Sequence, residues 1–217
     1  MFQITINKDE IAELEVETFP GRIHIIESAA QARKAIAFLR KQDCIGFDTE
    51  TRPSFKKGVF RPMALMQLST FEECFLFRIN KIGITESLKD FLEDSSILKI
   101  GLSLKDDFGV LRRSTDKASP EGFIELQTMV KNYGISDISL QKIYAILFDK
   151  KISKGQRLSN WEIPELSDAQ KQYAAIDAWA CLRIYHHLKN GKFNRDTSKH
   201  LKEIVEQPII SEEDETH

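Results

Sequence analysis

Cysteine is scarce in this sequence, and its three cysteines form no pairing pattern. Cys44, Cys74 and Cys181 are far apart and odd in number, and no Cys-x-x-Cys occurs. Disulfide frameworks and zinc-binding knuckles both rest on regularly spaced, paired cysteines. Neither class is indicated, and Cys44 and Cys181, which stand in apolar surroundings, are expected to be small core residues.

Long apolar runs and an excess of one charge are also missing. A membrane-spanning helix needs about 20 consecutive apolar residues, and no run approaches that length; residues 1–8 also lack the apolar core of a signal peptide. The 31 basic and 33 acidic residues leave a formal net charge of −2. Binding to nucleic acid would therefore need a local basic patch. We expect a protein without membrane contact in the reducing cytoplasm.

The length and composition predict one domain with extensions at both ends. The chain has 217 residues, of which 41% are apolar, which is enough for a real core. Residues 1–20 mix short apolar pieces with acids and are expected to form a loosely tied N-terminal extension. Residues 21–192 form the expected globular domain, and residues 193–217 an extension that ends in an acidic tail, expected to be disordered.

The order of strand-like and helix-like patterns predicts an α/β fold. Strand patterns at residues 44–51, 64–70 and 73–79 follow one another, and helix and strand patterns then alternate. This order predicts a mixed sheet with helices on both faces, and residues 44–51 are expected to form a central strand because they have two sequential partners. The other expected strands are residues 22–26, 97–102 and 122–126, and the expected helices are residues 29–39, 86–92, 105–113, 127–133, 139–148 and 166–185.

Two carboxylates lie one residue apart on the expected central strand. Asp48 and Glu50 follow the apolar residues Ile45 and Phe47. Residues i and i+2 of a strand point to the same face, so the two acids would stand side by side. Two like charges that close are costly without a cation, and Mg²⁺ and Mn²⁺ favour oxygen ligands. The alternative is a solvent-facing stretch of strand, where such a pair is harmless.

A third acid is expected where the strand at 97–102 runs into a helix. Asp106 and Asp107 lie in the first turns of that helix, where the helix dipole favours acids without any functional reason. Asp107 and Leu111 are four residues apart and share a helical face. If Leu111 packs on the sheet, Asp107 points inward and Asp106 points away, so Asp107 is the preferred candidate.

A fourth acid lies on the long helix near the C-terminus. Ser167 and Gln170 form a capping box that marks the start of this helix. Tyr173 and Asp177 are spaced so that they share a largely apolar stripe, and the Tyr173 hydroxyl can reach the same pocket. A bare buried Asp is costly, so Asp177 needs a metal ion or a partner. The alternative is a structural Asp that accepts a hydrogen bond from a Tyr or Arg.

These segments resemble the three exonuclease motifs of the DEDDy family of 3′–5′ exonucleases, which includes ribonuclease D and the Werner-syndrome exonuclease domain. The first motif is similar to Asp48-Thr49-Glu50, the second to Asp107 with Leu111, and the third to Tyr173-Ala174-Ala175-Ile176-Asp177. The match covers about residues 22–190. Many relatives have Asn four residues before the second-motif Asp, whereas this chain has Ser103.

The resemblance implies a ribonuclease H-like fold and two divalent ions, Mg²⁺ or Mn²⁺. By motif position, Asp48 would bridge both ions, and Glu50 and Asp177 would complete the site that holds the attacking water. Asp107 would bind the second ion, largely through water. Tyr173 would orient the attacking water, since a tyrosine with an ordinary pKa near 10 is a poor base at neutral pH.

Two basic segments are candidates for binding nucleic acid. The first precedes Trp161, and the second follows the Asp48–Glu50 pair; either could contact phosphates, and neighbouring aromatic rings could stack on bases. The alternative is two solvated loops. The candidate residues are Lys150, Lys151, Lys154, Arg157 and Trp161 in the first segment, and Arg52, Phe55, Lys56, Lys57, Phe60 and Arg61 in the second.

The leading functional hypothesis is therefore a metal-dependent 3′–5′ exonuclease that hydrolyses phosphodiester bonds at single-stranded or recessed 3′ ends. The similarity to the Werner-type motifs favours DNA. The alternative within enzymes is a ribonuclease D-like RNA-trimming enzyme, because discrimination between the sugars depends on contacts to the 2′-hydroxyl that no motif fixes. The alternative from another class is an inactive nucleic-acid-binding module.

Overall fold

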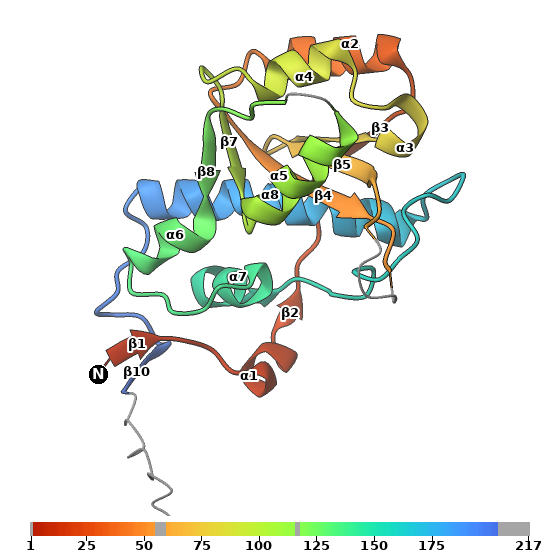
Figure 1. Ribbon diagram of the computed structural model, residues 1–217. Helices are drawn as coiled ribbons and strands as arrows, with labels where there is room; N and C mark the ends of the chain where they lie inside the picture. The colour runs from red at the N-terminus through yellow and green to blue at the C-terminus, as the bar shows by residue number, and fades with distance from the viewer. Residues whose placement is uncertain (1, 55–59, 116–117, 204–217) are drawn as a thin grey trace, which may run out of the picture.

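The computed structural model describes residues 2–54, 60–115 and 118–203. A six-stranded mixed sheet lies at its centre, with the strand order β3-β6-β5-β4-β7-β8 (Figure 1). The strands of this sheet are β3 (Arg22–Ile26), β4 (Cys44–Thr51), β5 (Met63–Ser69), β6 (Glu73–Phe77), β7 (Leu98–Gly101) and β8 (Phe123–Glu125).

Strand β4 is central, as its two sequential partners predict. It pairs antiparallel with β5 and parallel with β7. Strand β5 pairs antiparallel with β6, and β3 and β8 close the two edges in parallel. The three strand patterns that follow one another in the sequence therefore form an antiparallel run, and residues 22–26 form an edge strand.

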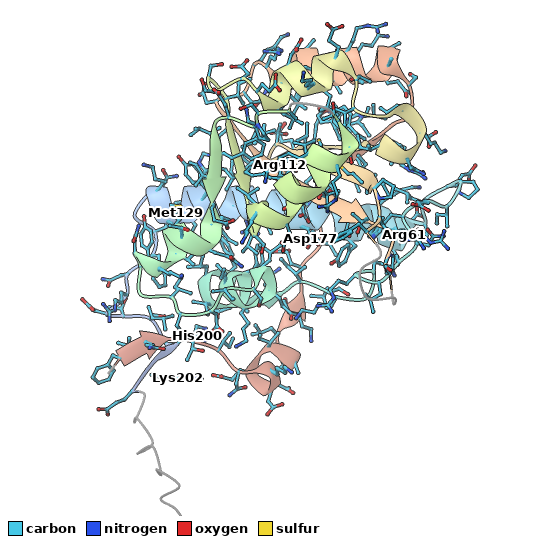
Figure 2. The ribbon with its side chains drawn as sticks, in the orientation of Figure 1. Arg61, Arg112, Met129, Asp177, His200 and Lys202 are labelled. Atoms are coloured by element: carbon cyan, nitrogen blue, oxygen red, sulfur yellow. The ribbon has the colours of Figure 1, made fainter. Side chains whose placement is uncertain are left out.

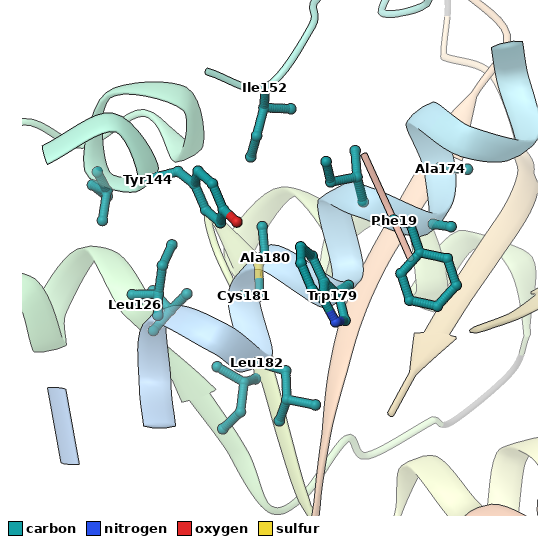
Figure 3. Close-up of a cluster of buried hydrophobic side chains, with 14 of the residues drawn as sticks. Phe19, Leu126, Tyr144, Ile152, Ala174, Trp179, Ala180, Cys181 and Leu182 are labelled. Carbon is teal, nitrogen blue, oxygen red and sulfur yellow. The ribbon is translucent and has the colours of Figure 1, made fainter. Parts of the chain in front are cut away.

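Helices cover both faces of the sheet, as predicted (Figure 1). On one face, Phe47 packs with buried residues of α2, α4 and α5. On the other, Tyr144, Trp179 and Leu126 belong to a second core built around α8 (Figure 3). The helices are α1 (Lys8–Ala12), α2 (Ala29–Leu39), α3 (Ile79–Ile82), α4 (Glu86–Leu92), α5 (Leu104–Ser114), α6 (Leu126–Lys131), α7 (Leu140–Phe148) and α8 (Asp168–Lys189).

Helix α8 crosses the sheet directly over β4. Its N-terminus has the predicted capping box, in which the Ser167 side chain accepts from the Gln170 backbone N–H and the Gln170 side chain accepts in return. A Cβ atom at Gly46 would lie 1.8 Å from the carbonyl oxygen of Ala178, so only glycine lets the helix approach this closely. This contact brings residue 177 of the helix beside residue 48 of the strand.

The expectation of a loosely tied N-terminal extension is wrong for its described residues. Strand β1 (Phe2–Ile4) pairs antiparallel with β10 (Leu201–Glu203), and β2 (Glu15–Val16) pairs parallel with β9 (Lys150–Lys151). Ile4, Ile6, Ile11 and Phe19 are buried in the α8 core. Phe2, Ile4 and Ile6 alternate with polar residues at the strand period, but the partner strand β10 lies about 200 residues further along the chain, so the sequence did not show that this segment is tied to the domain.

The C-terminal extension also folds back onto the domain as far as β10, which runs beside β1. His200 and Lys202 mark this region (Figure 2). The acidic residues 211–215, expected to be a disordered tail, lie outside the described residues. Among the helices that the structure describes, none combines the length and the apolar character needed to cross a membrane.

Candidate active site

Three carboxylates meet where α8 crosses β4. Asp48 and Glu50 lie on the same face of β4 as Gly46, which is the face that α8 covers, and Asp177 projects from α8 (Figure 2). One oxygen from each of the three lies within 4.8 Å of the others. The two-residue period of the strand places the first two acids together, and the close helix crossing adds the third.

Asp107 lies beside this cluster, in the first turn of α5. It is buried and Asp106 is exposed, so the inward direction predicted from the spacing to Leu111 is confirmed. The Thr49 hydroxyl donates a hydrogen bond to Oδ1 of Asp107. The charge of Asp107 contributes to the raised pKa of Asp48, but Asp107 is not one of the three acids in mutual contact.

The cluster is electrostatically strained. Burial raises the pKa of Asp48 well above its usual range, and the charges of Asp107, Asp177 and Glu50 raise it further. Burial, followed by the charge of Asp177, raises the pKa of Glu50 as well. Among the described residues, no Lys, Arg or His forms an ion pair with any of these four acids. In the described part of the chain, no ion pair therefore offsets the burial and mutual repulsion that raise these pKa values.

Tyr173 stands one helical turn before Asp177. Burial raises the pKa of Asp177, and the Tyr173 hydroxyl lies close enough to the Asp177 carboxylate to lower it by a smaller amount. The pKa of Tyr173 is itself raised, first by burial and then by the charges of Asp177 and Glu50. A phenol in this setting stays protonated at neutral pH and acts as a hydrogen-bond donor.

Trp161 cannot stack on a base, contrary to the expectation that it binds nucleic acid. Its side chain is fully buried, with its ring 6.0 Å from that of Tyr173. Its indole N–H makes no hydrogen bond of good geometry within the described chain, yet it lies close enough to the Glu50 carboxylate to lower the pKa of that group. Trp161 therefore packs behind the acid cluster, and its sequence neighbourhood carried no sign of its burial.

The basic residues divide into two groups. Lys154 and Arg157 line a groove of about 560 Å³ that also contains Tyr173 and Asp177, so they face the acid cluster along one channel. Lys150 instead pairs with Glu17, 3.5 Å from Nζ to Oε1.

Lys151 lies away from the groove and donates to the Ala12 carbonyl. Arg52 pairs with Glu162 at 3.3 Å and is half-exposed. Phe60 is exposed and lies under the Arg113 guanidinium. Phe55, Lys56 and Lys57 lie outside the described residues.

The groove contains further residues that no motif indicated. Gln127 and Ile138 line it, from α6 and from the segment before α7. Ser103, the residue that departs from the second motif, lines it as well, at the N-terminal cap of α5. These residues are far apart in the chain and meet only in the folded domain. Gly46 was recognisable in principle, because a glycine inside an apolar strand often marks the close approach of another backbone.

Solved structures share this architecture. The EXO domain of Nibbler from Aedes aegypti superposes with a TM-score of 0.71 at 19% identity, covering 83% of this chain and 96% of that one. Ribonuclease D from Escherichia coli gives a TM-score of 0.69 at 21% identity, covering 77% of this chain and 44% of that one. The fold is therefore that of the ribonuclease H-like exonuclease domains, as predicted.

Sequence comparison gives the family. The model of the 3′–5′ exonuclease family matches residues 23–191, and this chain belongs to that family. The bifunctional 3′–5′ exonuclease/ATP-dependent helicase WRN of Mus musculus is 37% identical over 199 residues, which cover 87% of this chain and 14% of that protein. Ribonuclease D of Haemophilus influenzae is 32% identical over 174 residues, covering 78% of this chain and 42% of that protein.

The chain spans less than two thirds of the length of the relatives that it matches. The share is 14% for the mouse protein, and 65% for a 3′–5′ exonuclease of Arabidopsis thaliana that is 30% identical. The similarity therefore concerns the exonuclease domain of these proteins.

Proposed function

We propose that this protein is a metal-dependent 3′–5′ exonuclease that removes nucleotides from the 3′ ends of nucleic acid. The observation that carries the proposal is the group of Asp48, Glu50 and Asp177, whose oxygens lie within 4.8 Å of one another in a chain of the 3′–5′ exonuclease family. We further propose that residues 21–192 carry the activity.

The donor set fits a pair of hard divalent cations. It consists of carboxylate oxygens only, as Mg²⁺ and Mn²⁺ prefer, and burial together with mutual repulsion raises the pKa values of Asp48 and Glu50. Cations would lower those values again. Asp48, Glu50 and Asp177 would hold one ion, with Asp48 shared to a second ion near Asp107. Such ions would activate a water molecule and stabilise the leaving 3′-oxygen.

The protein groups around the cluster have separate roles in this proposal. Tyr173 keeps its proton, since its pKa is raised, and its hydroxyl orients the attacking water as a hydrogen-bond donor. Thr49 holds one oxygen of Asp107, which leaves the other free to face the second ion. Trp161 shields Glu50 from bulk water.

The groove beside the cluster fits a single strand. Its volume of about 560 Å³ and the basic side chains of Lys154 and Arg157 suit a phosphate backbone that leads to Asp177. Arg52, at the end of β4, would contact phosphates on the other side, exchanging its exposed ion pair with Glu162. Nucleic acid is thus the proposed substrate and partner. The cytoplasm is the proposed location.

DNA is the proposed substrate, with RNA as the second candidate. The 37% sequence identity to the mouse exonuclease/helicase supports DNA as the substrate. The similarity of 32% to ribonuclease D supports RNA, and a solved Trypanosoma brucei ribonuclease D of the same fold holds RNA, with a TM-score of 0.67. Contacts to the 2′-hydroxyl in the groove would decide between the two.

The test is a time course on 5′-labelled single-stranded DNA and RNA of one sequence, with Mg²⁺, Mn²⁺ or EDTA. We expect a ladder that shortens from the 3′ end, depends on the metal and is absent in Asp48→Ala. The polymer that is degraded faster identifies the preferred sugar. Binding of both polymers without any ladder would instead support an inactive nucleic-acid-binding module.

A further inference from the structure

The N-terminal strap, defined here as residues 15–19, lies against the segment that carries the basic groove residues Lys154 and Arg157. Its strand β2 pairs in parallel with β9, with Glu15 opposite Lys150 and Val16 opposite Lys151. The backbone N–H of Glu17 extends this pairing by donating to the Lys151 carbonyl at 2.8 Å. Lys154 and Arg157 follow β9 in residues 152–157, which are called the basic loop here. The strap therefore fixes the position where the basic loop begins.

Glu17 is the centre of the strap's polar contacts. Its Oε2 accepts from the Tyr144 hydroxyl at 2.9 Å and from Nη1 of Arg183 at 3.0 Å, and its Oε1 lies 3.5 Å from Nζ of Lys150. These partners come from α7, α8 and β9. One side chain therefore ties together the three elements that surround the basic loop.

Arg183 is held in place independently of Glu17. Its guanidinium carbon lies 4.3 Å from the ring centre of Phe148 and 4.6 Å from that of Trp179. Aromatic faces on an arginine fix its plane. The arginine is thus held by its aromatic neighbours, and the carboxylate of Glu17 attaches the strap to it.

The strap also reaches the segment of α8 that carries Tyr173. The backbone N–H of Phe19 donates to Oε1 of Gln172 at 3.2 Å. A cavity of about 200 Å³ lies between the strap, the basic loop and α8, and Glu17, Ser153 and Tyr173 are among the residues that line it. Ser153 and Tyr173 also line the large groove, so the cavity and the groove share a wall.

We propose that Glu17 is a positioning residue for nucleic-acid binding. By fixing the strap to Tyr144 and Arg183, it holds β9 and the basic loop so that Lys154 and Arg157 point along the groove toward a phosphate backbone. This inference rests on the proposed function, because it assigns a role in substrate binding at the same site. Glu17 has no role in bond cleavage in this proposal.

The direction in which the Kd for nucleic acid changes when Glu17 is replaced distinguishes positioning from a simple effect of charge. Glu17 is negative, so its removal would strengthen the binding of a polyanion if charge alone mattered. Loss of positioning would weaken binding instead. Glu15 provides a matched control, since it is an exposed acid in the same short strand.

The experiment compares Glu17→Gln with Glu15→Gln in the full chain, using a fluorescent single-stranded DNA 12-mer and its RNA counterpart. Anisotropy in EDTA gives the Kd without turnover, and kinetics with Mg²⁺ give KM and kcat. We expect Glu17→Gln to raise Kd and KM about fivefold, with kcat within about twofold of wild type, as the loss of roughly one oriented phosphate contact predicts. Glu15→Gln should leave Kd unchanged or slightly lower.

A double-mutant cycle tests whether Glu17 acts through the basic loop. In a Lys154→Ala, Arg157→Ala background, Glu17→Gln should change Kd by less than about 1.5-fold, because the cations that it positions are gone. An undiminished fivefold effect in that background, or equal Kd values for Glu17→Gln and Glu15→Gln, would overturn the inference while leaving the exonuclease proposal intact. A wild-type protein that binds neither polymer would overturn both.

If Glu17→Gln does not fold, Tyr144→Phe tests the same contact with a smaller change. It removes the hydrogen bonds of the Tyr144 hydroxyl to Glu17 and from Arg183, and it keeps the Glu17 charge and the ring. We expect it to raise Kd by about twofold and to lose that effect in the Lys154→Ala, Arg157→Ala background. An unchanged Kd for a folded Tyr144→Phe would count against positioning through this contact.

Discussion

Two acidic sites lie along α8, and they differ in what balances their charge. Both combine a carboxylate with a tyrosine hydroxyl: Asp177 with Tyr173, and Glu17 with Tyr144. At Glu17, burial raises the pKa, but the Tyr144 hydrogen bond, the charge of Lys150 and the hydrogen bonds from the Thr18 backbone and Arg183 outweigh it, so the pKa is lowered. At Asp177 burial dominates and the pKa is raised.

The difference separates an acid that has protein partners from one that would hold a metal ion in the proposed function. At Glu17 the protein supplies its own cation, so the carboxylate is satisfied and ties three elements together. At Asp177 three acids share a buried space, and the part of the chain described here supplies no cation to pair with them. Such an arrangement destabilises the metal-free protein and becomes favourable once cations bind.

Removing one acid from the proposed metal site should give the largest effect. Asp177→Asn keeps the shape of the side chain but removes a ligand charge, so kcat should fall on the order of 10³-fold or more. The melting temperature of the metal-free variant should rise, because mutual repulsion is relieved. Steady-state kinetics and calorimetry in EDTA measure the two quantities. A variant that retains activity within tenfold would remove Asp177 from the metal site.

Tyr173→Phe should give a smaller loss that is confined to turnover. The water would lose its hydrogen-bond donor while the carboxylates stay in place, so kcat should fall about 10- to 100-fold with the metal concentration for half-maximal activity unchanged. Tyr133→Phe is the matched control, since that hydroxyl donates to the Leu188 carbonyl away from the cluster. Equal turnover for both variants would exclude Tyr173 from the mechanism.

The stability of the metal-free protein should fall as the pH rises. Burial raises the folded-state pKa of Asp177 to about 7, whereas an unfolded Asp titrates near 3.8. Between these values the folded state binds more protons than the unfolded state, so stability is fully present below the unfolded pKa and is lost as the pH rises through the folded pKa.

The melting temperature in EDTA should therefore drop by on the order of 5 °C between pH 5 and pH 8. Added Mg²⁺ should stabilise the protein more at pH 8 than at pH 5, because protons compete with the cation. Thermal scans across this range give both trends, and Asp177→Asn should flatten the first. A stability that rises over this interval in EDTA would contradict the strained-cluster interpretation.

Glu17→Gln should affect stability in the opposite direction to Asp177→Asn. Hydrogen bonds to charged groups contribute about 1.5–3 kcal/mol, and partial exposure of Arg183 reduces this, so the melting temperature should fall by about 4 °C. The same thermal scans in EDTA measure it, with Glu15→Gln as the control. If both acid-removing variants shifted the melting temperature in the same direction, the contrast between the two sites would not hold.

Local patterns were sufficient for the elements and for the direction of single side chains. The strand period placed Asp48 beside Glu50, the helical period turned Asp107 inward, and the capping box at Ser167 marked the start of α8. Each of these depends on residues a few positions apart, where backbone geometry alone relates sequence to direction. The resemblance to a family then predicted that the segments converge.

Contacts between distant segments left no comparable signal. The burial of Trp161 and the attachment of the strap through Glu17 depend on residues that are far apart in the chain. The residues next to Trp161 in the sequence do not show whether its side chain is buried. Likewise, the residues next to Glu17 do not show that it pairs with Arg183. These were the places where expectations from sequence failed.

The amino-acid sequence by itself determined the order of the elements, the central strand and the carboxylates that it carries, because period and capping are local properties of the backbone. Only the tertiary structure decided which acids come together without an ion-pair partner among the described residues and which acid pairs with an arginine. That decision follows from the close crossing of α8 at Gly46 on one side and the pairing of β2 with β9 on the other. Charge balance is a property of groups brought together in space, so it appears only in the folded chain.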